Sequence, residues 1–213
     1  MKRKSAVIIA IIIFGIVSSA AQGLQPIQLP PPQTEIGKPL MQALKLRQSS
    51  RSFDSKALPM QEISNLLWVA YGVNRKESGK RTAPSAMNWQ EVDVYVSLAE
   101  GAYLYDAVSN CLKPIIAKDL RSATGTQSYV ASAPLNLVYV ADMSRVSKGS
   151  EEDKTLYTAA DVGFIAENVY LYCASQGLSV VVRGSVNRAP LAEALNLRPD
   201  QKVILAQTVG YGK

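Results

Sequence analysis

The chain has 213 residues, 47% of them hydrophobic and 19% charged, a balance that fits one folded domain with a sizeable core. It contains no histidine, which excludes histidine-dependent catalytic triads and the usual zinc sites. The formal net charge is +6, from 23 basic and 17 acidic residues, and no basic stripe with interleaved aromatic residues is present. We therefore expect no nucleic-acid partner.

The first 21 residues have the three-part layout of a secretory signal peptide. Three basic residues are followed by an apolar run over 6–17 and by small residues over 18–21 that suit cleavage. The apolar run is shorter than the roughly 20 residues that a membrane-spanning helix needs. We expect Sec-type export to the periplasm, with an uncleaved membrane anchor as the alternative. Without Lys2, Arg3 and Lys4 the charge balance is 20 against 17, or +3.

Residues 22–38 are rich in proline and polar groups, with Pro30, Pro31 and Pro32 at their centre. This composition predicts an extended arm without a core of its own. The arm is either a plain linker or a segment that wraps a partner subunit, and the sequence leaves both open. The folded domain is predicted to span residues 39–213.

The rest of the chain mixes helices and strands without regular βαβ alternation. In order, the pattern predicts helices over 39–47 and 58–72, loops over 77–82 and 84–90, strands over 92–98, 102–105 and 135–140, a long helix over 156–175, a strand over 178–182, a helix over 188–195 and a strand over 203–209. The predicted fold class is therefore α+β, with a largely antiparallel sheet.

The long helix over 156–175 keeps one side small, through residues such as Ala160 and Gly163. Small residues let another helix or a cofactor approach closely, and they are equally compatible with a central core helix. Cys111 and Cys173 are far apart in sequence and lack metal-ligand spacing, so we interpret them as two buried thiols. A disulfide between them stays open.

The segment Arg47–Phe53 places two guanidiniums, Arg47 and Arg51, around Gln48, Ser49 and Ser50. Arginine offers a planar fork of donors that matches phosphate oxygens, and serine hydroxyls and backbone N–H groups can complete the shell. We interpret the segment as an anion-binding site. Because histidine is absent, we expect a bound cofactor to carry the chemistry if the protein is an enzyme.

A second candidate segment is the loop that precedes the strand over 92–98. Its side chains Ser85, Asn88 and Gln90, which follow Pro84, present hydroxyl and amide groups. A flat heterocycle with carbonyls and ring nitrogens needs such partners. An ordinary polar loop is the alternative for this segment taken alone.

A third candidate segment, Arg183, Gly184 and Ser185, follows the strand over 178–182. A strand that ends in Gly-Ser exposes backbone N–H groups to whatever lies above it. Such an N–H suits a ring nitrogen that cycles between acceptor and donor, as flavin N5 does on reduction. By itself the segment only permits this role.

Together and in this order, the segments resemble the FMN-dependent nitroreductase family, and most of all its branch of azoline-forming oxidases of thiazole/oxazole peptides. The resemblance covers residues 29–213 and includes R-x-S-x-R-x-F, P-S-x-x-N-x-Q, D-x-G-x-x-x-E-N and a terminal V-G-Y. It implies a sandwich fold that dimerises through long helices. Both FMN sites of the homodimer would then lie at the interface between subunits.

The resemblance implies a role for each matching residue. Three residues would hold the FMN phosphate and ribityl chain, with two others close by: Arg47, Ser49 and Arg51, then Gln48 and Ser50. The isoalloxazine would be lined, from the other subunit, by Pro84, Ser85, Asn88 and Gln90. Its N5 edge would face Arg183, Gly184 and Ser185, mainly through their backbone, and the phosphate would lie near Lys213.

One position departs from the family, many of whose members have an acidic or small residue near Ser185. Arg183 brings a positive charge to this edge. A cation beside the flavin would favour the anionic reduced form and raise the flavin potential. We treat this effect as a hypothesis, which the midpoint potential of Arg183→Ala tests.

The activity implied by the resemblance is ping-pong hydride transfer from a reduced donor to an electron-poor acceptor such as a nitroaromatic or a quinone. No catalytic side chain is expected, because the flavin carries the chemistry. Export conflicts with NAD(P)H as donor, since reduced nicotinamide is scarce outside the cytoplasm, and FMN would have to be acquired after translocation. The alternatives are a substrate-oxidising dehydrogenase of the azoline-oxidase type and a non-catalytic flavin-binding protein.

Overall fold

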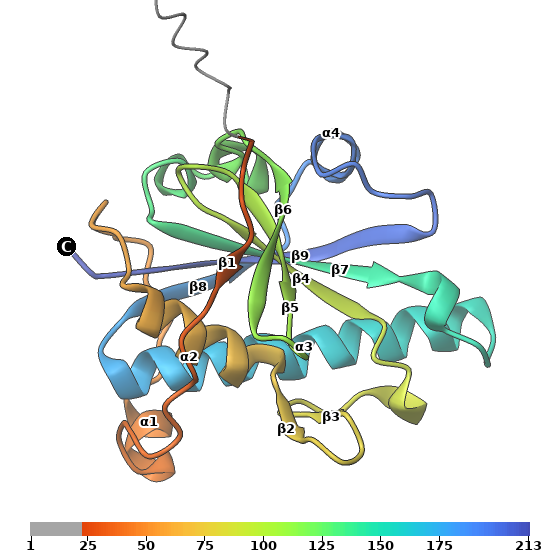
Figure 1. The fold of residues 1–213 in the computed structure, drawn as a ribbon, viewed down its shortest axis with the longest axis horizontal. Helices are drawn as coiled ribbons and strands as arrows, with labels where there is room; N and C mark the ends of the chain where they lie inside the picture. Colours follow the sequence, from red (N-terminus) through yellow and green to blue (C-terminus); the bar gives the residue numbers. More distant parts are fainter. Residues whose placement is uncertain (1–22) are drawn as a thin grey trace, which may run out of the picture.

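The computed structural model describes residues 23–213, so the signal peptide predicted for residues 1–21 lies outside the described residues. The centre of the folded domain is a seven-stranded sheet in the order β1-β6-β5-β4-β7-β9-β8, with every neighbouring pair antiparallel (Figure 1). The prediction of an α+β fold with a mainly antiparallel sheet flanked by helices is confirmed. No helix within residues 23–213 is both long and apolar enough to cross a membrane.

The strands of the central sheet are β1 (Ile27–Gln28), β4 (Val92–Ser97), β5 (Ala102–Asp106), β6 (Cys111–Ile116), β7 (Leu135–Asp142), β8 (Ser179–Arg183) and β9 (Gln201–Gly210). A separate hairpin is formed by β2 (Val73–Arg75) and β3 (Lys80–Arg81). The helices are α1 (Leu40–Leu46), α2 (Met60–Tyr71), α3 (Glu151–Gln176) and α4 (Arg188–Ala194). Short 3-10 turns are η1 (Ala86–Asn88), η2 (Arg121–Thr124), η3 (Ser128–Val130) and η4 (Met143–Arg145).

Helices cover both faces of the sheet. Figure 1 shows α1, α2 and α3 on one side and α4 on the other. Side chains alternate between the faces of a strand, so Tyr139 of β7 packs in the core with α3, whereas Val138 and Val140 pack with Leu191 of α4. Because both faces are covered, every residue of β7 is buried.

α3 begins five residues earlier than the sequence predicts, and its ends have clear local causes. Ser150 and Asp153 form a capping box, in which each side chain accepts a hydrogen bond from the backbone N–H of the other. Three acidic residues in the first turn favour a helix N-terminus. Gly177 ends the helix with a φ of 75°, the left-handed conformation that glycine adopts readily.

The proline-rich arm packs onto the core of the domain. β1 pairs with β6, and Leu29 is only 2% exposed. The Pro30 carbonyl accepts hydrogen bonds from Ser64 Oγ at 2.5 Å and from Asn110 Nδ2 at 2.9 Å. The arm therefore extends the sheet and covers α2 of its own protomer.

The sequence pattern missed the strand β6 and the short strands β1, β2 and β3. β6 contains Lys113 and Pro114, which break the apolar alternation of a strand. The end of the loop predicted over 77–82 forms β3, a short polar strand that an apolar pattern cannot reveal. Cys111 and Cys173 are both free thiols in the structure, and complete burial raises the pKa of the Cys173 thiol.

Candidate cofactor site

The arginine segment runs along the outer edge of β8, which ends the sheet. The N–H of Ser50 donates to the carbonyl of Val180 at 2.9 Å. The hydroxyl of Tyr170, on α3, accepts from the N–H of Val182 at 2.9 Å and lies 2.8 Å from Ser49 Oγ. These contacts cover edge groups that would otherwise lack partners and hold the segment in place.

The two guanidiniums of this segment are exposed and available to an anion. Neither Arg47 nor Arg51 has a carboxylate within 4 Å among residues 23–213. The Arg47 guanidinium lies over the ring of Tyr170, 5.5 Å from the ring centre, and such stacking orients a cation. Two cations beside serine hydroxyls form a donor set that suits phosphate.

A cavity of about 240 Å³ opens beside the segment, between α1 and the start of β8. Its walls include Lys38, Gln48, Ser50 and Ser179. Ser179 Oγ donates to Ser50 Oγ at 3.1 Å. The cavity is therefore lined by polar groups that the fold holds together.

The C-terminus reaches the same region. The N–H of Asp54 donates to the carbonyl of Tyr211 at 2.9 Å. Gly212 comes so close to β8 that an added Cβ would lie 2.9 Å from Ser179 Oγ. Lys213 is exposed and follows directly, so the fold brings it to the end of the sheet that holds the arginine segment.

The segment after β8 is divided between two faces of the sheet. Gly184 and Ser185 are exposed beyond the end of the strand. The Arg183 guanidinium is buried on the α4 side, where it donates to the Thr124 carbonyl at 2.6 Å and to Asn136 Oδ1 at 3.0 Å. Burial lowers the pKa of Arg183 to about 10. The backbone of Gly184 and Ser185 is therefore accessible beyond β8, whereas the Arg183 charge is turned away from α3.

The loop predicted to line the isoalloxazine packs against the first half of α3. The N–H of Ala86 donates to Asp161 Oδ2 at 2.8 Å, and the N–H of Gln90 donates to Ser85 Oγ at 2.8 Å. Met87, Asn88 and Gln90 have positive φ angles of 50°, 56° and 49°. Backbone of this kind is costly outside glycine and is concentrated at functional sites.

A second cavity, of about 220 Å³, lies against this loop. It is lined by Pro84, Ser85, Asn88 and Gln90 together with Arg75, Lys80, Arg81 and Ala83. All four residues that the sequence singled out in the loop thus share one cavity. The three cations that face them were not predicted as site residues.

Two buried carboxyls support the loop from beneath, and sequence reasoning missed their role. Glu91 is 0% and Asp161 is 3% exposed. Ser85 Oγ donates to Glu91 Oε2 at 3.2 Å. Burial raises the pKa of both carboxyls, and Asp161 further raises that of Glu91, so the pair favours retention of a proton. The available signal was a glutamate directly before a strand of alternating apolar residues.

The two halves of the predicted site lie on opposite flanks of α3. Tyr170 contacts the arginine segment, whereas Asp161 contacts the Pro84–Gln90 loop. These two α3 residues are nine positions apart, which is about two and a half turns and about 14 Å along the axis. Their side chains therefore leave the helix on opposite sides. One protomer brings the arginine segment, β8 and the C-terminus together, but not the loop.

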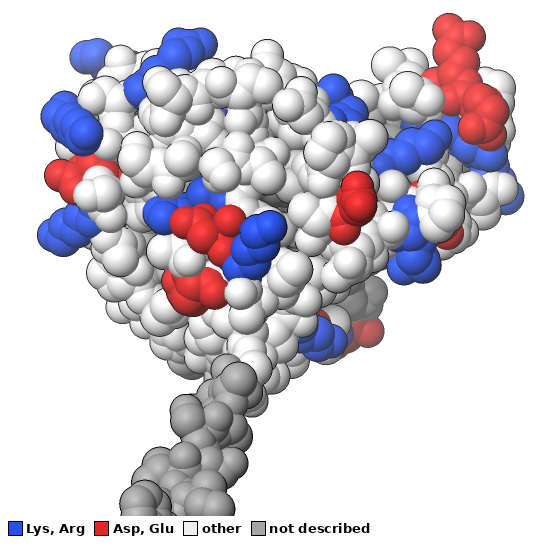
Figure 2. All heavy atoms as spheres, turned by 90° about the horizontal axis from the view of Figure 1, so that it is seen from above, with Lys and Arg blue, Asp and Glu red and all other residues white. Residues whose placement is uncertain are grey.

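A larger cavity, of about 780 Å³, lies between the proline-rich arm, the β2–β3 hairpin and residues 107–110, and neither candidate segment lines it. Figure 2 shows acidic and basic side chains interspersed with uncharged surface on the face seen from above. The described part of the chain contains no group of three or more Cys, Asp or Glu residues that could hold a metal ion. The arginine segment and the loop therefore remain the main candidates.

Comparison with known proteins agrees with this geometry. The nitroreductase family model matches residues 44–211. A candidate nitroreductase of Methanocaldococcus jannaschii is 30% identical over 180 residues, which cover 77% of this chain and 90% of that protein. A crystal structure of a candidate nitroreductase from Ralstonia eutropha has 48% identity and a TM-score of 0.84, covering 88% of this chain and 90% of that chain.

A chain of the E. coli microcin synthetase McbBCD complex, with truncated pro-MccB17 bound, has a TM-score of 0.69 at 20% identity. It covers 78% of this chain and 70% of its own, and this likeness concerns the fold alone. The family match, by contrast, spans most of the chain and includes all three candidate segments. The protein therefore belongs to the nitroreductase family, whose members are generally flavin-dependent oxidoreductases.

Proposed function

We propose that the protein is an FMN-dependent oxidoreductase that moves electrons by hydride transfer from a reduced donor to an electron-poor acceptor such as a nitroaromatic or a quinone. Donor and acceptor would occupy the same site in turn. The observation that carries the proposal is the pair of exposed guanidiniums, Arg47 and Arg51, held at the edge of β8 without a carboxylate partner among the described residues.

The residues present suit FMN. Arg47, Arg51 and Ser49 would hold the phosphate and the ribityl chain, with Lys213 nearby, because these groups offer charged and neutral donors at one edge of the sheet. The backbone of Gly184 and Ser185 would face the ring from the end of β8. FMN supplies hydride-transfer chemistry when bound, and the protein binds and orients it.

A homodimer would complete the site. The outward face of α3 exposes Phe164 (48%) beside Gly163, and α1 exposes Leu40 (62%) and Met41 (76%). Large apolar side chains exposed on two helices are expected where a partner covers them. If the α3 helices of two copies pack together, the loop of one copy can approach the arginine segment of the other. This arrangement would bring together the arginine segment and the Pro84–Gln90 loop, which α3 separates within one protomer.

The test begins with binding. Purified protein incubated with FMN and freed of excess should retain the flavin and be yellow. Under anaerobic conditions the colour should bleach with a suitable donor and return with a nitroaromatic or a quinone. Because export is predicted, a quinol must be tried as donor beside NADPH and NADH. Protein that does not bind FMN would overturn the proposal.

Two other results would favour one of the alternative functions. Bleaching by an azoline-containing peptide, with formation of the azole, would favour the substrate-oxidising dehydrogenase. A yellow protein that no donor reduces would favour a non-catalytic flavin-binding role.

A further inference from the structure

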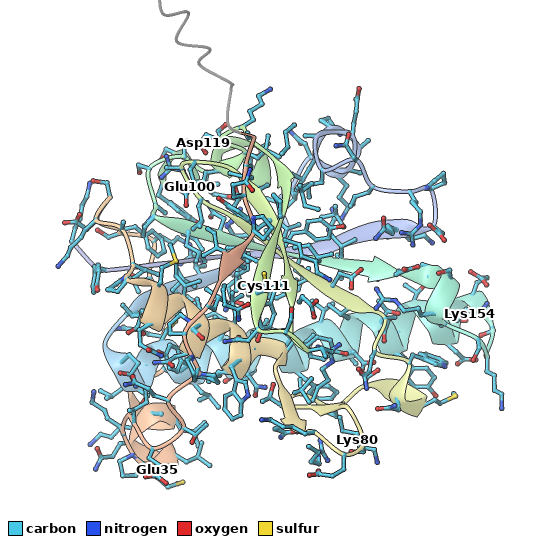
Figure 3. The ribbon with its side chains drawn as sticks, in the orientation of Figure 1. Glu35, Lys80, Glu100, Cys111, Asp119 and Lys154 are labelled. Carbon is cyan, nitrogen blue, oxygen red and sulfur yellow. The ribbon has the colours of Figure 1, made fainter. Side chains whose placement is uncertain are left out.

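A basic hairpin stands beside the Pro84–Gln90 loop. Residues 73–81 contain four cations, Arg75, Lys76, Lys80 and Arg81, and a single acid, Glu77. Within the described part of the chain, none of the four has a carboxylate within 4 Å. Figure 3 shows Lys80 on this hairpin, on the side of the sheet that α3 covers. The hairpin therefore concentrates positive charge that the described residues do not neutralise.

Two of these cations are held in place by neutral partners. Arg81 lies over the ring of Tyr71, 4.8 Å from its centre, and donates to Gln90 Oε1 at 2.8 Å and to the Tyr71 carbonyl at 3.1 Å. Arg75 Nη2 donates to the Arg81 carbonyl at 2.8 Å. Arg81 Nη2 and Arg75 Nη1 make no hydrogen bond to another described residue. The guanidiniums are thus oriented and keep donors free for a ligand.

The hairpin and the loop share one cavity. Arg75, Lys80 and Arg81 line the same space of about 220 Å³ as Ser85 and Asn88. The nearby carboxyls of Glu91 and Asp161 form no ion pair with these cations and accept hydrogen bonds from Ser85 and Ala86. The volume lies below the roughly 300–1,000 Å³ of pockets that enclose a whole drug-sized ligand. It fits one small charged group.

We propose that this cavity binds the anionic group of the electron donor or acceptor, and hence that the preferred substrate carries a carboxylate or a phosphate. The inference rests on the proposed function, because the loop is the part of the site predicted to line the flavin ring. Arg75 and Lys80 determine specificity in this scheme: they contact the charged end of the substrate, while the reacting end lies over the flavin. Arg81 also positions Gln90 of the loop.

The first experiment measures binding directly. FMN-loaded protein is titrated by calorimetry with benzoate, phenyl phosphate and neutral benzamide, which are aromatic and unreactive. We expect an anion to bind at least tenfold more tightly than benzamide. The double variant Arg75→Gln/Lys80→Gln should lose this preference while its affinity for benzamide stays the same. Benzoate and phenyl phosphate, compared with each other, show which anion the site prefers.

The matched control removes two charges elsewhere. Lys118→Gln/Lys148→Gln changes two exposed lysines outside the hairpin and should leave the preference intact. If the double variant folds poorly, Lys80→Gln alone is used, because this side chain is exposed and makes no hydrogen bond to another described residue. It should weaken anion binding severalfold. Equal binding of anions and benzamide by the wild-type protein, or a preference that survives in the variants, overturns the proposal.

A second experiment separates this inference from the proposed function. Turnover of 4-nitrobenzoate and 4-nitrobenzamide is compared, and kcat/KM should favour the anion at least tenfold in the wild type only. Equal turnover of the two overturns the anion site and leaves the oxidoreductase intact. If neither is reduced and FMN does not bind, the proposed function fails, and the calorimetric preference of the flavin-free protein still decides the anion site.

Discussion

The hydroxyl groups of Ser49 and Tyr170 lie 2.8 Å apart, and this contact ties the segment after α1 to the second half of α3. Tyr170 also accepts the N–H of Val182 and lies beneath the Arg47 guanidinium. One side chain therefore links the helix, the edge strand and the arginine segment. It organises the candidate phosphate site although its own sequence context gives no sign of that role.

Arg47→Ala should weaken FMN binding at least tenfold. The substitution removes a charge-assisted contact worth about 1.5–3 kcal/mol, and the exposed guanidinium has no carboxylate partner among the described residues whose loss would confuse the result. Fluorescence titration of FMN gives the dissociation constant. Lys118→Ala, at another exposed cation, should bind like the wild type. Unchanged affinity in Arg47→Ala would mean that the phosphate lies elsewhere.

Tyr170→Phe should reduce both stability and FMN affinity, because it keeps the ring under Arg47 but removes the hydroxyl that serves Ser49 and Val182. An N–H left without its partner costs about 1–3 kcal/mol. Urea unfolding and FMN titration measure the two effects. Tyr157→Phe, whose ring contacts Trp89, is the matched control. If the two variants behave alike, the hydroxyl does not organise the site.

Glu91→Gln should flatten the dependence of stability on pH. Burial raises the pKa of Glu91 above its ordinary value of 4.5, so its contribution to stability is complete below about 4.5 and is lost as the pH rises through the folded-state pKa. The variant cannot ionise there. Between pH 4 and pH 8 its free energy of unfolding should therefore fall less than that of the wild type.

Chemical unfolding across this pH range checks the expectation. Glu193→Gln, at an exposed position on α4, serves as the control and should follow the wild-type curve. If the free energy of unfolding depends on pH in the same way for Glu91→Gln and the wild type, the buried carboxyl pair does not retain a proton.

Phe164→Glu should produce a folded monomer that binds FMN poorly. The side chain is 48% exposed on the outward face of α3, so the charge would disturb an interface between copies more than the core. Light scattering and FMN titration report assembly and binding. Val108→Glu changes an apolar side chain that is 83% exposed outside the helices and should remain dimeric. A dimeric Phe164→Glu with full affinity would remove α3 from the interface.

Arg183→Met should lower stability and leave the flavin potential nearly unchanged. The guanidinium is buried on the α4 side, and its removal leaves the Thr124 carbonyl without a donor, at about 1–3 kcal/mol for an unsatisfied group. Asn136 Oδ1 then keeps the Thr208 hydroxyl as its donor. Thermal unfolding and a spectroelectrochemical titration separate the two effects. A large fall in potential without loss of stability would restore the hypothesis that this charge acts on the flavin.

Local patterns in the sequence determined much of the fold. Alternation with period two predicted β4, β5 and β7, and helical periodicity predicted α2, α3 and α4, because each pattern reflects one buried face of one element. The motifs around Arg47, Ser85 and Gly184 located the candidate segments. A helix, a strand or a motif can be read within some ten residues, where backbone geometry alone sets which side chains share a face.

Only the tertiary structure decided how these segments relate. The burial of the Arg183 guanidinium depends on Asn136, 47 positions away, and the contact of Asp161 with Ala86 joins residues 75 positions apart. The separation of the loop from the arginine segment follows from the way α3 passes between them. Local periodicity carries no information about such pairs, because the packing of the whole chain chooses which distant side chains meet.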